Sequence, residues 1–423
     1  MAEPDAPGPR GADSLRRSNA AAVLRALRDE GPGSRAELAA RTGLAKATVG
    51  TIVAALTDAD VLQPDAEAAP STGRGRPGRR LTLAGGRPVG VGVEVNVEYV
   101  AAVVLDLAGV PQLELTRDVP PGGDVTAHLA ALSRAVATRL REQDRHVLGA
   151  TVAVPGLVGG DDRTAVWAPN LQVAGTGLAA TLDTAFGWRG RTRVSNDADC
   201  SALAELHHGA GRGAGDLLYL TGTVGIGAGL VEGGRLLRGA RGFAGEVGHL
   251  PLGAAHARCG CGRSGCWEAS VGLHALLAAV DMPEAGTPVT TARAVAAAAT
   301  GDPELAEAVA GLARWLGRGL GVLAGVLDPG RIVLGGYFAP LGDLVVVPAR
   351  RELAATLATS DLGVPDLVLG ELGTEAAATG AAQRSLADVF AGRADPFAGT
   401  SAAEPGEAEE AGESGEAGES RTG

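Results

Sequence analysis

The chain has 423 residues, of which 45% are hydrophobic, 3% are aromatic and 20% are charged. This length favours two or three domains, and the apolar content excludes a wholly disordered chain. No apolar run reaches the roughly 18 residues that a membrane-spanning helix needs, and the first twenty residues lack the apolar centre of a secretory signal. We therefore expect a cytoplasmic protein with no membrane partner.

The formal net charge of −12 is unevenly distributed along the chain. Residues 1–87 contain 13 Arg or Lys and 10 Asp or Glu, whereas the remaining residues contain 24 and 39. A slightly basic beginning followed by an acidic body fits an N-terminal module that binds an anion.

Residues 15–87 are predicted to form a winged helix-turn-helix, preceded by a flexible N-terminus over residues 1–14. Apolar residues at helical spacing predict helices from Ser18 to about residue 30, over residues 35–41 and over residues 44–56. Ser34 and Glu37 have the spacing of a capping box at the start of the second helix. A short strand near Val61, a basic segment over residues 71–80 and the alternating residues 81–83 then predict a hairpin with a basic tip.

From residue 88 the pattern becomes that of an α/β body, which we expect to extend to residue 395. Strands are predicted within residues 89–107, 148–154, 217–220 and 332–334, and helices over residues 125–143, 311–327 and 375–390. Residues 396–423 are predicted to be a disordered acidic tail, because residues 401–423 contain seven Glu, one Arg and no aromatic residue.

The strongest local signal is a cluster of cysteines with a histidine nearby. Cys259, Cys261 and Cys266 follow His249 within 17 residues. Clustered thiols in a cytoplasmic protein indicate a metal site, and three thiolates with one imidazole would make a closed, structural zinc shell. His256 is an alternative fourth ligand, reduced thiols without a metal are the simpler alternative, and Cys200 is expected to be an isolated buried residue.

Two further motifs follow predicted strands, and each has two interpretations. The glycines between Gly222 and Gly229 could admit a phosphate to the backbone N–H groups, or could form a tight turn between buried strands. Asp197 follows a strand and opens a helix, so it could bind a hydroxyl or accept its proton, or could act as a helix cap. Arg74, Arg76, Arg79 and Arg80 at the hairpin tip favour contact with DNA phosphates over a solvated loop.

Together these residues resemble the ROK family of repressors and sugar kinases, in its regulator branch, over residues 18 to about 392. The head carries the motifs Ser34-Arg35-Ala36-Glu37-Leu38-Ala39, Thr42-Gly43-Leu44, Ala47-Thr48-Val49 and Gly75-Arg76-Pro77. The body carries Val154-Pro155-Gly156, Pro169-Asn170-Leu171, Asn196-Asp197, Gly225-x-Gly227-x-Gly229, Gly245-Glu246-Val247-Gly248-His249, Cys259-x-Cys261-Gly262-x-x-Gly265-Cys266-x-Glu268 and Leu334-Gly335-Gly336. The resemblance implies a two-lobed, actin-like (ribonuclease-H-like) ATPase fold behind the DNA-binding head.

The resemblance also implies site residues. The positions that align with the family's sugar ligands are Asn170, Asn196, Asp197, Glu246, His249 and Glu268. The implied zinc ligands are His249, Cys259, Cys261 and Cys266, and Asp197 aligns with the catalytic base of the kinases. Converging polar groups suit a polyol, since each desolvated hydroxyl needs a partner.

One motif departs from the family's kinases. Their phosphate loop has the pattern Asp-x-Gly-Gly-Thr, but this chain has Glu94-Val95-Asn96-Val97-Glu98. A carboxylate at Glu98 repels a triphosphate, and Val97 blocks close approach to the backbone. The aromatic residue that often follows Pro-Asn-Leu is also missing. The sequence therefore favours a sugar sensor without catalytic activity.

The sequence thus predicts a sugar-responsive transcriptional regulator, a repressor of carbohydrate genes. The third predicted helix of the head, which is the second helix of the helix-turn-helix, would present Lys46, Thr48, Gly50 and Thr51 to the major groove. Arg74 and Arg76 would lie beside it. A homodimer or homotetramer would bind a palindromic operator. The alternatives are an ATP-dependent sugar kinase carrying a DNA-binding head, and a regulator whose body binds only a partner protein.

Overall fold

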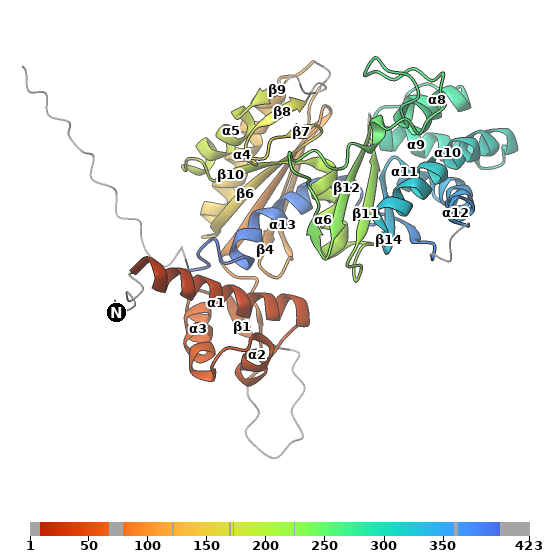
Figure 1. The fold of residues 1–423 in the computed structure, drawn as a ribbon. Coiled ribbons are helices and arrows are strands. Elements are labelled where there is room, and N and C mark those ends of the chain that lie inside the picture. The colour runs from red at the N-terminus through yellow and green to blue at the C-terminus, as the bar shows by residue number, and fades with distance from the viewer. Residues whose placement is uncertain are drawn as a thin grey trace, which may run out of the picture.

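The computed structural model describes residues 9–66, 79–120, 122–168, 171, 173–223, 225–358 and 363–397. A small head lies beneath a body of two lobes (Figure 1). In these ranges no helix combines the length and the apolarity that a membrane crossing requires. The predictions for Asn170, Arg74, Arg76 and the acidic residues after 397 lie outside the described residues.

The head contains three helices and a two-stranded hairpin, as predicted. These are α1 (Pro9–Glu30), α2 (Arg35–Thr42), α3 (Lys46–Asp58), β1 (Leu62–Pro64) and β2 (Leu81–Leu83). The prediction of a flexible N-terminus over residues 1–14 is wrong for residues 9–14, which are helical. The Arg16 guanidinium lies 4.3 Å from the centre of the Phe397 ring, and this contact with a distant segment supports the early turns of α1.

The helix-turn-helix geometry depends on local signals that the sequence carries. The Ser34 N–H donates to the Glu37 carboxylate at 2.7 Å, and the Glu37 N–H donates to the Ser34 hydroxyl at 3.3 Å, which completes the capping box. Gly43 ends α2 with a φ of 70°, a conformation that favours glycine. Val49, Val53 and other apolar residues of α3 are fully buried against α1 and α2.

The two lobes are built on sheets of the same topology. In each sheet the first three strands along the chain pair in antiparallel fashion, the first with the second and the second with the third. The fourth strand pairs in parallel with the first, and the fifth pairs in parallel with the fourth. The first sheet has the order β10 (Thr192–Asn196), β6 (His146–Val154), β3 (Pro88–Val95), β4 (Tyr99–Asp106), β5 (Pro111–Asp118). The second has the order β13 (Arg235–Leu236), β12 (Ile226–Glu232), β11 (Leu217–Gly222), β14 (Arg331–Gly336), β15 (Asp366–Leu369). This duplication is the actin-like arrangement that the resemblance implied.

Helices cover both sheets. The first lobe has α4 (Val125–Glu142), α5 (Gly177–Phe186) and a small sheet of β7 (Leu157–Val158), β8 (Ala165–Ala168) and β9 (Val173–Gly175). The second has the 3-10 turns η1 (Val247–His249) and η2 (Gly373–Glu375), with α7 (Glu268–Val271), α8 (Leu273–Val280), α9 (Pro288–Ala299), α10 (Pro303–Leu327), α11 (Phe338–Leu341) and α12 (Asp343–Leu357). Two helices, α6 (Asp197–His208) and α13 (Ala376–Phe390), lie between the lobes (Figure 1).

Helix α13 packs closely on both β3 and α6. A Cβ at Gly92 in β3 would overlap the α13 backbone, and a Cβ at Gly380 in α13 would overlap the carbonyl of Cys200 in α6. Only glycine allows backbones to approach so closely. Helix α13 is therefore fixed between the strand that begins the body and the helix that follows Asn196.

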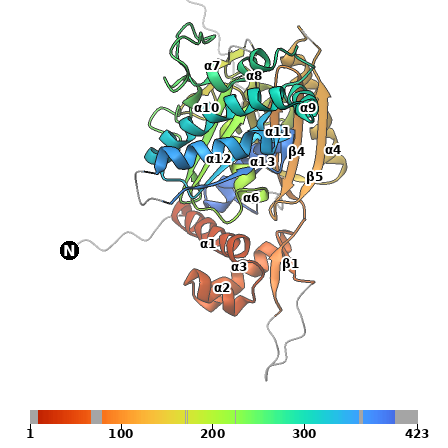
Figure 2. The same ribbon diagram turned by 90° about the vertical axis from the view of Figure 1, so that its right-hand side faces the viewer.

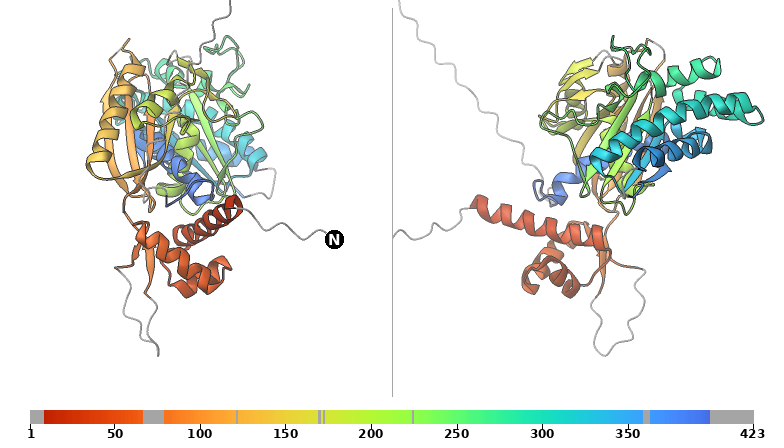
Figure 3. Two further views of the ribbon diagram at one scale, coloured as in Figure 1. Left: turned by 90° about the vertical axis from the view of Figure 1, so that its left-hand side faces the viewer. Right: turned by 45° about the vertical axis from the view of Figure 1, so that its right-hand side comes forward.

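The C-terminal end of α13 also contacts the head. Arg25 of α1 donates to the carbonyl of Phe390, and buried apolar residues of the head and of α13 form one continuous cluster. Figure 2 and Figure 3 show α1 lying along this end of the body. Phe397 belongs to the same cluster and is buried, so the prediction of a disordered tail from residue 396 is wrong for residues 396 and 397.

Candidate functional site

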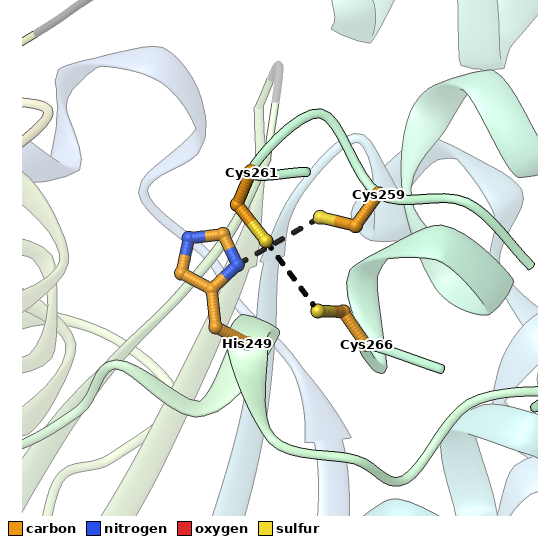
Figure 4. Close-up of side chains that lie close together, drawn as sticks. All are labelled: His249, Cys259, Cys261 and Cys266. Carbon is orange, nitrogen blue, oxygen red and sulfur yellow. Dashed lines mark hydrogen bonds between the residues drawn. The ribbon is translucent and has the colours of Figure 1, made fainter. Parts of the chain in front are cut away.

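The structure brings the predicted metal ligands together. One possible ligand atom from each of His249, Cys259, Cys261 and Cys266 lies within 4.8 Å of all the others (Figure 4). The His249 Nδ1 is 3.8 Å from the Cys259 sulfur, and the sulfurs of Cys261 and Cys266 are 3.6 Å apart. His256 is exposed and is not a member of this group, and Cys200 is buried elsewhere, in α6. The cluster can hold a metal ion.

The chemistry of the donor set fits zinc. Three sulfurs and one imidazole nitrogen are ligands that zinc prefers in closed tetrahedral sites. A tight loop presents them: the Cys259 N–H donates to the Arg263 carbonyl at 2.9 Å, and the Gly262 N–H donates to the Cys259 carbonyl at 3.0 Å. Gly262 has a φ of 87°, so the turn requires glycine there.

Glu268 connects this cluster to the second sheet. One carboxylate oxygen lies 3.5 Å from the Cys259 sulfur, and the other accepts a hydrogen bond of 3.0 Å from the backbone N–H of Ile226. Ile226 begins β12, directly after the glycine-rich turn. The position of Glu268 is therefore tied to both the cysteine loop and the β11–β12 hairpin.

The predicted sugar ligands that the structure describes lie around the start of α6. The Asn196 side chain accepts hydrogen bonds from the N–H groups of Ala198 and Asp199 and donates to the Gly156 carbonyl at 3.1 Å, so it caps α6. Asp197 is the next residue, and burial raises its pKa to about 7. The nearby charges of Asp199 and Glu246 act in the same direction.

Glu246 places a further carboxylate near this group. It directly precedes η1, which carries His249. Burial raises the pKa of Glu246, His249 opposes that shift, and the charge of Glu268 adds to it. The charge of Glu246 thus acts on Asp197, and the charge of Glu268 acts on Glu246.

A cavity of about 320 Å³ lies between the lobes, next to Asp197. Its lining includes Glu94 and Glu98 from the β3–β4 hairpin, Thr223 from the β11–β12 turn, and Thr287 at the start of α9. The segment Glu94–Glu98, which differs from the phosphate-loop pattern of the family's kinases, therefore forms part of the wall of this cavity.

Glu94 is the most buried acid of the cavity. It is 5% exposed, and the Tyr99 hydroxyl donates a hydrogen bond of 2.8 Å to its Oε1. Burial raises the pKa of Glu94 to about 8, although the hydrogen bond from Tyr99 opposes that shift. The sequence alone indicated neither the burial nor the tyrosine partner.

The glycine-rich segment forms a hairpin turn, the simpler of its two interpretations. Gly222 of β11 pairs with Ile226 of β12, and the Thr223 N–H donates to the Gly225 carbonyl at 3.0 Å. A Cβ at Gly222 would overlap the Tyr337 ring, and one at Gly225 would overlap the Glu268 carboxylate. Close packing thus accounts for these glycines.

Sequence reasoning missed a cluster of ion pairs beside α6 and α13. Asp162 forms ion pairs with Arg238 and, at 2.9 Å, with Arg384 of α13. Arg238 also lies 3.6 Å from Asp199 of α6. These residues are separated by up to 222 positions in the chain, and only the fold brings them together. They connect both interlobe helices to the loop between β7 and β8.

The head presents the predicted recognition residues on the outer side of α3. Lys46 and Thr51 are exposed, Thr48 and Gly50 are half-buried, and a Cβ built on Gly50 meets no atom within 4 Å. The opposite side of α3 is buried. Helix α3 therefore has a free face of small and basic residues, as a helix that enters a DNA groove requires.

Comparison with known proteins identifies the body. Residues 90–387 match the ROK family. The chain belongs to this family. Residues 18–66 match the IclR helix-turn-helix domain, a range that includes α2, α3 and β1. The ROK body and the helix-turn-helix head thus occupy separate parts of the chain.

Both kinases and repressors are similar to this ROK protein. A glucokinase of Streptomyces coelicolor is 29% identical over 310 residues, which are 69% of this chain and 96% of the relative. A xylose repressor of Caldicellulosiruptor bescii is 27% identical over 357 residues, or 80% and 88% of the two chains. The alignment with the repressor, which covers 80% of this chain, is longer than the ROK match over residues 90–387. It therefore extends beyond the ROK body.

A solved ROK family transcriptional regulator, a homolog of the E. coli MLC protein, has a TM-score of 0.74 to this chain. The aligned region covers 90% of this chain and 98% of the chain of that regulator, at 24% sequence identity. This likeness shows that the head and the two-lobed body together form a known fold.

Proposed function

We propose that this protein is a sugar-responsive transcriptional repressor, whose affinity for an operator changes when a sugar binds between its lobes. The observation that carries the proposal is the contact of one helix, α13, with both the interlobe region and the DNA-binding head. A regulator needs such an element, because a ligand shifts DNA affinity only if its site and the head share conformational states.

In this proposal α3 enters the major groove of an operator. Lys46 contacts phosphate, while Thr48, Gly50 and Thr51 face base edges or the backbone. Arg74 and Arg76 contact the adjacent backbone or minor groove. Two heads of a homodimer or homotetramer would bind the two halves of a palindromic site.

The sugar is proposed to bind beside the start of α6. Its ligands are Asn170, Asn196, Asp197, Glu246, His249 and Glu268. The charge effects of Glu246 on Asp197 and of Glu268 on Glu246 support this assignment, as does the need of each buried hydroxyl for a polar partner.

A structural zinc ion is proposed for the cluster of His249, Cys259, Cys261 and Cys266. Zinc there would fix the loop after η1 without taking part in chemistry, because four protein ligands leave no open coordination position. The Cys259 sulfur and the Glu268 Oε1 lie 3.5 Å apart. An ordered cysteine loop would therefore also order a sugar-facing carboxylate.

A signal path from the cleft to the head is proposed through α6 and α13. Asp197 begins α6, Gly380 fixes α13 against that helix, and Phe390 ends α13 in contact with α1. A shift of α6 on sugar binding would therefore be transmitted through close backbone contacts, which resist gradual deformation.

The altered phosphate segment argues against kinase activity. Glu94 and Glu98 line the cavity in which a nucleotide would need cationic or N–H donors. Without a neutralising cation the Glu98 carboxylate repels a triphosphate, and Glu94 supplies no N–H donor to it. A sugar kinase remains the second candidate, because Asp197 is present and burial raises its pKa to about 7, a value suited to a general base.

Titration of fluorescent DNA from the region upstream of the protein's own gene would test the proposal. Anisotropy should report saturable binding at fixed salt, with an affinity that changes about tenfold or more on adding one sugar of a panel that includes xylose, glucose and N-acetylglucosamine. Absence of binding to any genomic fragment would refute it. Sugar-dependent release of ADP from ATP would favour the kinase.

A further inference from the structure

The cavity between the lobes is strongly acidic. Among the described residues that line it, six are Asp or Glu and none is Lys, Arg or His: Glu94, Glu98, Asp118, Asp197, Glu284 and Glu375. Such a lining repels phosphates and other anions and attracts cations. The acidic cavity is thus poorly suited to a nucleotide, although a ligand-sized space is present.

One of these carboxylates has an unused acceptor atom. Tyr99 donates to Oε1 of Glu94, whereas Oε2 is buried and has no hydrogen-bond partner. An orphaned buried carboxylate oxygen is destabilising, and a donor that enters the cavity would remove that penalty. An ammonium N–H is the donor with the greatest electrostatic gain there, because its positive charge favours the ionised carboxyl. Glu94, which keeps its proton near neutral pH when no cation is bound, would release that proton to solvent when the ammonium binds.

The cavity lining includes a carboxylate from each lobe, Glu98 and Glu284. Glu98, in the β3–β4 turn, is close enough to Glu284, in the segment before α9, for the charge of Glu284 to raise the pKa of Glu98 in addition to the effect of burial. Glu375 of η2 lines the same cavity. A cation between Glu98 and Glu284 would replace repulsion with attraction and would draw the lobes together.

The cavity's carboxylates do not form one compact ligand group. Among the described residues the one group of three or more possible ligands close enough to hold an ion together is that of His249 and the three cysteines. The walls of the cavity also include apolar surface from Val97, Tyr99, Tyr219 and Val289. Separate acidic positions joined by apolar walls match an organic molecule with several positive charges.

We propose that the interlobe cavity binds an aliphatic polyamine, with one ammonium group donating to Glu94 Oε2 and another lying between Glu98 and Glu284. The methylene chain contacts the walls formed by Tyr99 and Tyr219. This inference goes beyond the proposed function and does not depend on it, because it concerns the body and requires neither DNA nor a sugar.

Calorimetric titration of the full chain with spermidine at physiological salt tests the inference. We expect saturable binding that Glu94→Gln and Glu98→Gln each weaken by about tenfold, the loss typical of one charge-assisted hydrogen bond. Glu142→Gln, at the exposed end of α4, removes the same charge away from the cavity and should leave the affinity unchanged.

Three outcomes would overturn the inference. One is no saturable heat with spermidine. Another is an equal effect of Glu98→Gln and Glu142→Gln, which would indicate nonspecific attraction to an acidic protein. The third is Mg²⁺ competing with spermidine at equal concentration, which would indicate a metal site. Glu98 is in a half-exposed turn, so its variant remains informative if Glu94→Gln fails to fold, as judged by circular dichroism.

Discussion

The guanidinium of Arg28, in α1, lies 4.4 Å from the centre of the Phe390 ring, at the end of α13. This cation–π contact joins the head to the body beside the hydrogen bond from Arg25 to the Phe390 carbonyl. The contact lies on the surface that the proposed signal must cross. It can be removed without emptying the buried position of Phe390.

Arg28→Ala should weaken the coupling between sugar and DNA while leaving the body folded. A cation–π contact at a partly exposed site contributes about 0.5–1 kcal/mol, so the sugar-induced change in DNA affinity should shrink about two- to fivefold. Anisotropy titrations with and without the sugar measure this ratio. Arg134→Ala, on the exposed side of α4, is the matched control. An unchanged ratio in Arg28→Ala would exclude this contact from the signal path.

Loss of one cysteine ligand should remove the metal and destabilise the second lobe. Cys266 is 2% exposed, and Cys266→Ser should reduce bound zinc from about one ion per chain to well below one. The Tm should fall by at least about 5 °C, since 1 kcal/mol corresponds to about 2–4 °C in a domain of this size.

Elemental analysis and thermal unfolding measure these two effects. Cys200→Ala serves as the control, because it removes a buried thiol outside the cluster and should leave the zinc content intact. A purified wild-type chain without stoichiometric zinc, with a Tm insensitive to chelator, would contradict a structural metal.

The sequence predicted best those features that depend on neighbouring residues. The capping box of Ser34 and Glu37 and the cysteine loop are local, so spacing was sufficient to find them. The pairing of Glu94 with Tyr99 and the ion pairs of Asp162 with Arg238 and Arg384 depend on tertiary contacts. No periodicity marks such contacts, and they were missed. The start of α1 was misplaced for the same reason, because Phe397 supports it from the other end of the chain.

Glu94 should make the folded protein less stable as the pH rises. In the unfolded chain the pKa of a glutamate is about 4.3. In the folded chain burial raises the pKa of Glu94 to about 8. Between these values the unfolded state has released its proton and the folded state retains it, so rising pH favours unfolding. The contribution to stability is fully present below about pH 4 and is lost as the pH approaches 8. Asp197 acts in the same direction, because its pKa is also raised, to about 7.

Glu94→Gln removes this contribution. Urea unfolding at pH 5 and pH 8 should show a loss of stability with pH that is smaller than in the wild type by about 1 kcal/mol or more, because one pKa unit corresponds to about 1.4 kcal/mol. His207, whose pKa burial lowers to about 4, has the opposite dependence but contributes equally in both proteins. Glu142→Gln is the control for the change in charge. Equal losses in Glu94→Gln and wild type would show that Glu94 is ionised in the fold.

The free face of α3 gives a test that separates DNA contact from folding. Gly50 has open space around its Cβ position, and leucine has a higher helix propensity than glycine by about 0.8 kcal/mol. Gly50→Leu should therefore fold at least as stably as the wild type. On an operator the new side chain would block close approach to the groove, so the DNA affinity should fall about tenfold or more at fixed salt. Gly325→Leu is the control: Gly325 is exposed on α10, and a Cβ built there likewise meets no atom within 4 Å. This variant should gain similar stability and keep full DNA affinity. If Gly50→Leu also kept full affinity, α3 would not be the helix that enters the groove.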